Sequence, residues 1–294
     1  MRFCRISSEF MKTYFDCIPC FLKQTLEAVR FVIDDENIQE NVLRQILKEV
    51  SAMDLNGTPP EMGWKIHKMV QEVTGNSDPY REIKQASTRF VLSLMPKLRA
   101  VMADSADPFE TAVRLSIAGN IIDMAIMAEF DTQRVYDALD HALSEPLNGE
   151  LKEFRAAAAS AKSILFLADN AGEIVFDRFL LEQLGLNRIT FVVKGSPIIN
   201  DATLEDAVES GLTDMVEVMD NGSDAPGTIL ESCSPEFKEK YESTDLIVAK
   251  GQANYETLSD IHRPIAFVLK AKCPVICKDI GCEPGSLIVR TRGL

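Results

Sequence analysis

The sequence lacks the features that mark several large classes of protein. Its 294 residues hold one Trp, and 31 Lys and Arg stand against 45 Asp and Glu, a formal net charge of −14. A chain this acidic repels nucleic acid and anionic lipid, so neither is expected as a partner. Apolar runs such as ILFLA at 164–168 fall far short of the roughly 18 residues of a membrane span. Because no signal-peptide core is found either, we expect a soluble, cytoplasmic protein.

Cysteine is present in an odd number, seven, and only Cys17 and Cys20 form a CxxC. Structural disulfides are therefore not expected in a reducing compartment. Three interpretations of the pair stay open: half of a thiolate metal site completed by Cys277 and Cys282, a redox pair, or buried structural thiols. The last is favoured because free Cys is so often interior.

The first part of the chain, residues 1–161, is predicted to be an all-helical subdomain, with 1–10 treated as an extension. Apolar residues recur there at three- and four-residue spacing. Asp107 and Pro108 make a helix start, with Asp as the cap and Pro at the first helical position. Further helices are predicted over 37–51, 60–74, 79–103 with a kink or end at Pro96, and 131–145.

The second part, residues 162–294, alternates short apolar runs with helical stretches. The runs are SILFLA, RITFVV, MVEVM, DLIVA, PIAFVL, PVICK and SLIVR. Strands that alternate with helices predict a mainly parallel sheet covered on both faces. The predicted fold is thus α/β, a Rossmann-like three-layer α/β/α core joined to the helical subdomain.

Polar residues that can carry chemistry follow four of the predicted strands. They are Asp169, Asn170 and Glu173 after the first, Lys194 and Asp201 after the second, Lys250 and Asn254 after DLIVA, and Lys270 after PIAFVL. Ligands of an open parallel sheet bind beyond the carboxyl ends of its strands. Carboxylates and carboxamides there suit a hard divalent cation, and lysines suit a phosphate held on it.

Each of these residues also has a purely structural interpretation. Asp169 and Asp201 can be ordinary helix caps, Glu173 can complement a helix dipole, and a lysine after a strand is usually solvated. Their repetition at equivalent strand ends favours a site. In addition, the sequence has no GxGxxG, GxxxxGK[ST] or GxSxG motif, which argues against a dinucleotide enzyme, a P-loop ATPase and a serine hydrolase.

The helical part holds one anomaly, SIAGNIIDMA at 116–125, where polar residues interrupt an apolar helix. Gly119 costs about 1 kcal/mol relative to Ala in a helix, so close approach to another element is its expected reason. Asn120 and Asp123 lie one turn apart on one face. From spacing alone, a satisfied buried polar pair is favoured over a functional role.

Six motifs together resemble one family. DCIPC, AGNIIDMA, LADNAGE, VVKGSPIINDAT, AKGQANYETL and AFVLKAKCPV, spread over the chain from Met11 on, are similar to motifs of the damage-control phosphatases, once catalogued as domain of unknown function 89. The CxxC resembles the stand-alone microbial and archaeal branch. At Gln252 and Ala253 other branches carry Asp-Leu, so substrate preference does not transfer.

The resemblance implies a helical region against a Rossmann-like core, and hydrolysis of phosphate monoesters of small metabolites, such as sugar phosphates, nucleotides or damaged metabolites, with Mn²⁺, Co²⁺, Ni²⁺ or Mg²⁺. It implies that Asp169, Asn170 and Asp201 hold the metal, and that Asp169, Asp201 and Lys270 are catalytic. The residues implied to bind substrate are Glu173, Lys194, Lys250, Asn254, Asn120 and Asp123. The nucleophile stays open between metal-bound water and an aspartate.

Two other functions stay open at this point. A Rossmann-like core also permits an S-adenosylmethionine-dependent carboxyl methyltransferase, although the loop after the first strand is acidic and amide-bearing rather than glycine-rich. The other alternative is a non-catalytic metal-binding protein whose lysines hold a structural anion. Fold alone does not separate these functions. The oligomeric state is not predicted.

Overall fold

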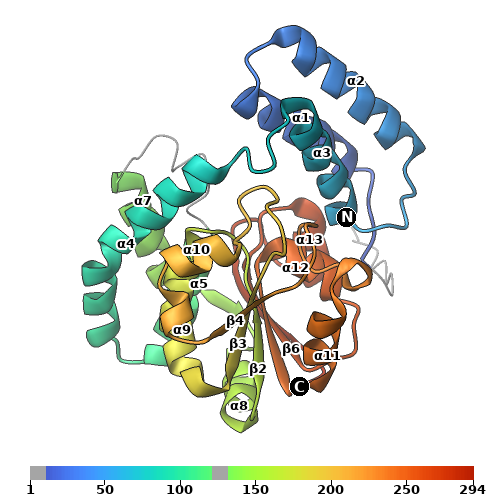
Figure 1. Ribbon diagram of the computed structural model, residues 1–294. Coiled ribbons are helices and arrows are strands. Elements are labelled where there is room, and N and C mark those ends of the chain that lie inside the picture. The colour runs from blue at the N-terminus through green and yellow to red at the C-terminus, as the bar shows by residue number, and fades with distance from the viewer. Residues whose placement is uncertain (1–10, 121–131) are drawn as a thin grey trace.

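The N-terminal part of the chain is helical in the structure, a computed structural model that describes residues 11–120 and 132–294. Its helices are α1 (Cys17–Val32), α2 (Glu36–Ala52), α3 (Pro59–Thr74), α4 (Arg81–Ala103), α5 (Pro108–Gly119), α7 (Thr132–Ser144) and α8 (Leu151–Ser160). Helices α1 to α3 group together at one end of the molecule, beyond one edge of the sheet (Figure 1). The predicted helices over 37–51, 60–74 and 79–103 are confirmed to within two residues, and Pro96 lies inside α4 without ending it.

A seven-stranded sheet forms the centre of the molecule. Its strands are β1 (Leu147–Gly149), β2 (Ile164–Leu167), β3 (Ile189–Val193), β4 (Glu217–Asp220), β5 (Leu246–Lys250), β6 (Ile265–Lys270) and β7 (Leu287–Arg292). The strand order is β1-β7-β6-β5-β2-β3-β4, and neighbours are parallel except for the antiparallel pair β6 and β7. The predicted α/β class with a mainly parallel, Rossmann-like sheet is confirmed.

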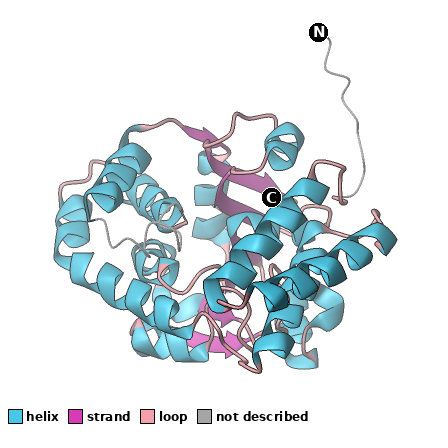
Figure 2. Ribbon diagram, turned by 90° about the horizontal axis from the view of Figure 1, so that it is seen from above, coloured by secondary structure: helices cyan, strands magenta, loops and turns pink. Residues whose placement is uncertain are grey.

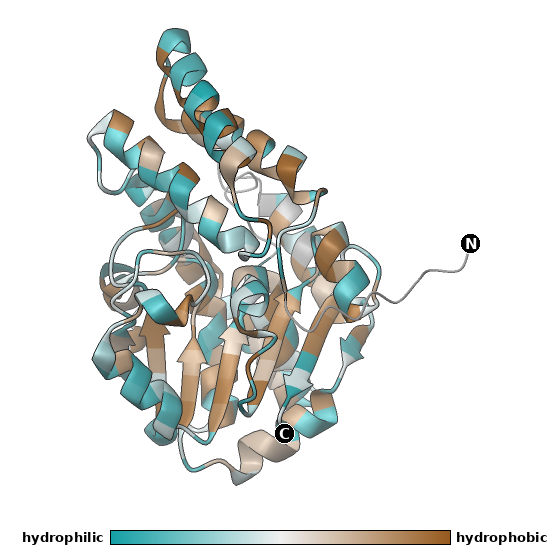
Figure 3. Ribbon diagram, turned by 90° about the vertical axis from the view of Figure 1, so that its right-hand side faces the viewer, coloured by the Kyte–Doolittle hydropathy of each residue, from teal (hydrophilic) through white to brown (hydrophobic). Residues whose placement is uncertain are grey.

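Helices cover both faces of this sheet (Figure 2). Alternate residues of one strand enter different cores: Phe166 packs with α5 and α9 on one face, and Leu165 and Leu167 pack with α11 and α12 on the other. The central strands are consequently mostly apolar, as the brown colour of several strands in Figure 3 shows. The C-terminal helices are α9 (Glu173–Leu184), α10 (Leu204–Glu209), α11 (Pro235–Ser243), α12 (Gly251–Leu258) and α13 (Pro274–Ile280), with 3₁₀ turns at Leu186–Arg188, Leu212–Asp214 and Leu230–Ser232.

Two local predictions were wrong. The run PVICK, expected as a strand, begins helix α13, because Pro274 occupies the first helical position, where its fixed φ fits and its missing N–H costs nothing. Strand β1 was not expected, since its three residues carry no apolar run. It pairs with β7 at the edge of the sheet. The division of the chain at residue 161 stays a prediction, and the sheet itself begins at Leu147.

The order of the strands reverses at β2. This strand pairs with β3 on one side and with β5 on the other. The loops that follow β2 and β5 therefore diverge from neighbouring points at the carboxyl ends of the strands. Such a switch point is where open α/β sheets bind ligands. No helix among the described residues has both the length and the apolar character needed to cross a membrane.

Candidate active site

The loops after β2 and β3 are joined by backbone hydrogen bonds. Asn170 and Asp201 form an isolated antiparallel bridge. Around it, the N–H of Ala171 donates to the carbonyl of Asn200 at 2.8 Å, and the N–H of Ala202 donates to the carbonyl of Asp169 at 2.8 Å. These bonds hold the two acidic segments, 32 positions apart in sequence, side by side at the carboxyl ends of their strands.

Asp169 lies at the centre of this arrangement. Its Oδ2 accepts a hydrogen bond from Nδ2 of Asn120, at the end of α5, over 2.7 Å. Gly251, the first residue of α12, packs against the same carboxylate so closely that a Cβ there would lie 1.8 Å from Oδ2. The side chain is thus held between the helical part of the chain and the segment that follows β5.

Burial and neighbouring charges set the electrostatics of the site. Burial raises the pKa of Asp169 well above its ordinary value, and the carboxylates of Glu173 and Asp201 raise it further. Burial also raises the pKa of Asp201, although Lys194, whose Nζ lies 3.4 Å from its Oδ2, acts in the opposite direction. A bound cation would favour the charged form of both carboxylates.

Glu173 connects the residues around Asp169. Its side chain is buried, and its Oε2 accepts hydrogen bonds from Nδ2 of Asn120 at 3.0 Å and from Nδ2 of Asn170 at 2.9 Å. Because the amide nitrogen of Asn170 is engaged, its side-chain oxygen is directed as an acceptor elsewhere. Glu173 therefore fixes the orientation of the side-chain amides of Asn120 and Asn170.

Lys250 lies beneath this network and is fully buried. Its ammonium contacts Glu173 Oε1, Asp177 Oδ1 at 3.0 Å and the carbonyl of Ser116 at 3.0 Å. Burial lowers the pKa of Lys250, but the two carboxylates outweigh burial and raise it above its ordinary value. Burial likewise raises the pKa of Asp177 to about 6, against the opposing effect of Lys250.

Three more of the expected residues lie at the same edge of the sheet. Lys194 is buried, and its ammonium contacts the carbonyl of Gly227. Asn254 is also buried, and its Nδ2 donates to the carbonyls of Ala168 at 3.1 Å and of Lys250 at 2.8 Å. Lys270, partly exposed, ends β6 two positions beyond the partner of Lys250. The remaining expected residue, Asp123, lies outside the described residues.

Sequence reasoning missed some contributors to the site. Asp177 lies one helical turn after Glu173, a spacing that places both on one face of α9, so the sequence did hold a signal for it. Lys272 adds to the positive potential at Asp169, and Lys84 of α4 adds to it at Asp201. The predicted reason for Gly119 is confirmed, since a Cβ there would lie 2.9 Å from Cγ of Glu173.

The cysteines of the described residues do not form a preorganised metal site. Across residues 11–120 and 132–294, no three His, Cys, Asp or Glu side chains lie close enough together to hold an ion. Cys17 is buried, as a structural thiol would be, but Cys20 is exposed. The absence of such a group of three among the described residues is compatible with Asp169, Asn170 and Asp201 as ligands. This set has only two carboxylates, and its third member is an amide, which is not one of those side-chain types.

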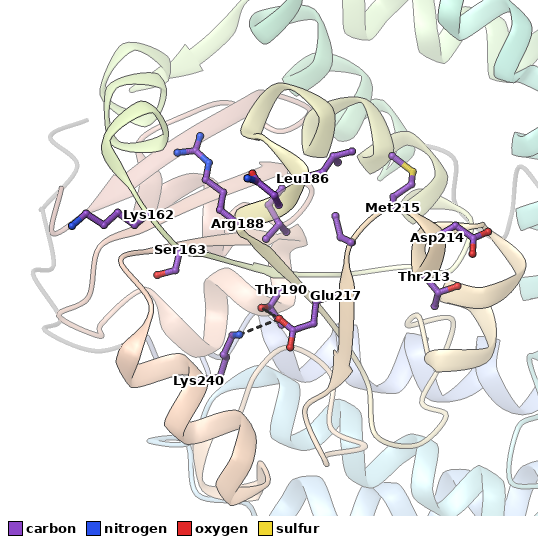
Figure 4. Close-up of a pocket in the computed structure, with 13 residues that line it drawn as sticks. Lys162, Ser163, Leu186, Arg188, Thr190, Thr213, Asp214, Met215, Glu217 and Lys240 are labelled. Carbon is purple, nitrogen blue, oxygen red and sulfur yellow. Dashed lines mark hydrogen bonds and ion pairs between the residues drawn. The ribbon is translucent and has the colours of Figure 1, made fainter.

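A cavity of about 520 Å³ opens at the opposite edge of the sheet (Figure 4). Its lining includes Lys162, Arg188, Thr190, Glu217 and Lys240. Lys240 Nζ lies 3.1 Å from Glu217 Oε2, and Thr190 donates to the same carboxylate at 2.7 Å. The cavity adjoins the amino ends of β3 and β4, so none of the expected site residues lines it.

Comparison with known proteins finds similarity over nearly the whole chain. The damage-control phosphatase ARMT1-like domain matches residues 13–288. An uncharacterized protein of Methanocaldococcus jannaschii is 34% identical, over 98% of each chain. A damage-control phosphatase of Archaeoglobus fulgidus is 35% identical over 93% of this chain and 97% of its own length.

A third relative, the damage-control phosphatase PH1575 of Pyrococcus horikoshii, is 31% identical over 95% of this chain and 97% of its own. The crystal structure of that protein, described as a DUF89 family protein, superposes with a TM-score of 0.84. It is aligned over 97% of this chain and all of the other, at 30% identity.

Proposed function

Since the chain belongs to the damage-control phosphatase ARMT1-like family, we propose that it is a divalent-metal-dependent phosphatase of small phosphorylated metabolites. The substrate class covers sugar phosphates, nucleotides and damaged phospho-metabolites. The observation that carries the proposal is the convergence of Asp169, Asn170 and Asp201 at the switch point of the sheet.

Asp169, Asn170 and Asp201 fit a hard divalent cation. Their donors are oxygen atoms, the type that Mn²⁺ and Mg²⁺ prefer and that Co²⁺ and Ni²⁺ accept. Burial, together with the carboxylates of Glu173 and Asp201, raises the pKa of Asp169, and a cation would favour its charged form. A cation bound by these residues would polarise a phosphoryl oxygen and offset the charge of the phosphate.

The remaining residues divide into two groups by their place at the edge of the sheet. Lys194 and Lys270 lie at the rim of the sheet, where we assign them to orient the phosphate and to neutralise charge on the departing oxygen. Glu173 and Lys250 are buried beneath the rim, and their contacts are with other side chains. We therefore assign Glu173 and Lys250 to positioning, with Asn120 and Asn254 holding Asp169 and the end of β5 in place.

The proposal is tested by release of inorganic phosphate. The purified chain is stripped with a chelator, then assayed on a panel of sugar phosphates and nucleotides with Mn²⁺, Co²⁺, Ni²⁺ or Mg²⁺ restored. We expect release only with metal. Asp169→Asn is expected to lower it by about 100-fold or more, since even indirect supports of a metal typically contribute 10- to 100-fold.

Asp104→Asn is the matched control, because this exposed residue at the end of α4 loses the same charge far from the site. It should retain the activity of the unmodified chain. Phosphate release that Asp169→Asn leaves intact would exclude Asp169 as an essential ligand. If no metal restored release on any substrate, while methyl transfer from S-adenosylmethionine was detected, the phosphatase proposal would be wrong.

A further inference from the structure

Two cysteines meet at the C-terminal end of helix α13. Gly281 ends the helix in the left-handed conformation, with φ 82° and ψ 42°. The N–H groups of Gly281 and Cys282 both donate to the carbonyl of Cys277, at 2.8 and 2.9 Å. The second of these bonds spans the six residues of a Schellman motif, which is frequently accompanied by a contact between the side chains at its two ends.

The thiols of Cys277 and Cys282 are both free in the reduced chain. They differ in access to solvent, because Cys277 is buried and Cys282 is partly exposed. Burial raises the pKa of Cys282, and the Ser286 side chain only partly opposes this. Cys282 is thus the sulfur that a reagent in solution reaches first, with Cys277 directly behind it.

We propose that Cys277 and Cys282 are a reversible oxidation site that closes to a disulfide when a low-molecular-weight disulfide is the oxidant. The thiolate of Cys282 attacks one sulfur of that reagent, and the first small thiol leaves with the electron pair of the broken bond. The thiolate of Cys277 then attacks Cys282 Sγ in the mixed disulfide and releases the second small thiol. The two cysteine protons end on the two released thiols, so two electrons pass to the reagent.

Local geometry permits this closure. A disulfide requires Cα atoms about 4.4 to 6.8 Å apart, and the 2.9 Å hydrogen bond from the N–H of Cys282 to the carbonyl of Cys277 keeps the two backbones adjacent. The intervening loop is short, and Gly281 absorbs its left-handed turn. A Cβ at Gly281 would have no atom within 4 Å, so this turn has open space around it.

The pair lies close to the rim of the candidate active site. Cys277 Sγ donates to the carbonyl of Ala271 over 3.9 Å, and Ala271 directly follows Lys270. The same carbonyl accepts the N–H of Gly285 at 2.7 Å, so the loop that carries Cys282 is already fastened to the end of β6. Oxidation replaces the thiol proton that points at this carbonyl with a covalent bond across the loop.

The test uses the reduced full-length chain and oxidised glutathione. After an acid quench, free thiols are counted and the peptides are mapped by mass spectrometry. We expect the peptides that carry Cys277 and Cys282 to lose both thiols and two hydrogens in mass, through a Cys277–Cys282 link that dithiothreitol reverses. Thiols of Cys277 and Cys282 that stay free, or a lasting glutathione adduct on Cys282, would overturn the proposal.

Three variants separate this pair from the other thiols. Cys277→Ser should stop at a mixed disulfide on Cys282, because the resolving thiol is gone. Cys282→Ser should leave Cys277 free, since its burial shields it from the reagent. Cys17→Ser should form the link as the unmodified chain does, whereas loss of the link there would assign the chemistry to Cys17. None of these readouts depends on phosphatase activity.

Discussion

The carboxylate of Asp169 lies directly against the backbone of Gly251, with room for no side-chain atom between them. A Cβ at residue 251 would lie 1.8 Å from Oδ2 and 2.4 Å from Cγ of Asp169. Gly251 also has φ +77°, a conformation that L residues with side chains rarely adopt. Since Gly251 follows β5 and Asp169 follows β2, this contact is where the two sides of the switch point touch.

Gly251→Ala is expected to lower metal-dependent phosphate release by about 100-fold, the scale of losing a support of a metal ligand. The added methyl group must displace the Asp169 carboxylate, because the three atoms nearest to it all belong to the Asp169 side chain. The measurement is release of inorganic phosphate at saturating metal, together with circular dichroism to show that the fold is retained.

Gly75→Ala is the matched control for this variant. Gly75 also has a positive φ, +63°, and a Cβ there would meet nothing within 4 Å. It therefore carries the backbone strain of the substitution without the contact. Equal loss of activity in both variants would mean that strain, rather than displacement of Asp169, is responsible.

The packing of α5 on α9 supplies a second prediction. A Cβ at Gly119 would lie 2.9 Å from Cγ and 3.2 Å from Cα of Glu173. Gly119→Ala should destabilise the chain by about 1 to 3 kcal/mol through overpacking. Gly63→Ala, inside helix α3 with its nearest atom at 3.9 Å, should instead stabilise it by about 0.5 to 1 kcal/mol. Urea denaturation compares the two, and a similar sign for both would contradict the close approach.

Much of the fold follows from local patterns in the sequence. Buried strands such as ILFL are apolar throughout because both faces of the sheet are covered. Capped amphipathic helices such as α3 carry the residues that mark where they begin and end. The edge strand β1 could not be predicted, because it is specified by its partner β7 rather than by its own residues.

The candidate site was predictable in part for a related reason. The carboxyl ends of parallel strands share one edge, so Asp169, Asp201 and Lys250 could be placed together before any coordinates. How deeply each side chain is buried below that edge cannot be predicted from the same sequence pattern. Burial of Lys250 between Glu173 and Asp177 depends on how α5 and α9 pack, which is a tertiary property.

The buried ion cluster of Lys250, Glu173 and Asp177 leads to a prediction about stability. Lys250→Met removes the cation and leaves two buried carboxylates without it, which should cost about 3 to 5 kcal/mol of unfolding free energy. Combining it with Glu173→Gln and Asp177→Asn removes the unpaired charges and should recover part of the loss. Guanidinium denaturation measures each step.

Lys23→Met is the control for removal of a lysine, because its partner Glu27 is exposed on the surface of α1. Exposed pairs of this kind contribute little, so no resolvable change is expected. If Lys250→Met proved as harmless as Lys23→Met, the cluster would be supplying no net stability to the fold.

Glu256 of α12 makes stability depend on pH. Burial raises its pKa from the ordinary 4.5 to about 7, and the hydrogen bond that Gln252 donates to Oε1 over 3.1 Å only partly opposes this. Between these two values the folded chain binds a proton that the unfolded chain has lost. The contribution of Glu256 is therefore most favourable below about pH 4.5 and is lost as pH rises toward about 7.

Glu256→Gln cannot titrate, so the difference in unfolding free energy between variant and unmodified chain should shift in favour of Gln from about pH 5 to about pH 8. Urea midpoints at both pH values give that difference. The exposed Glu72→Gln should show no such shift, and a shift of equal size there would remove burial as the cause.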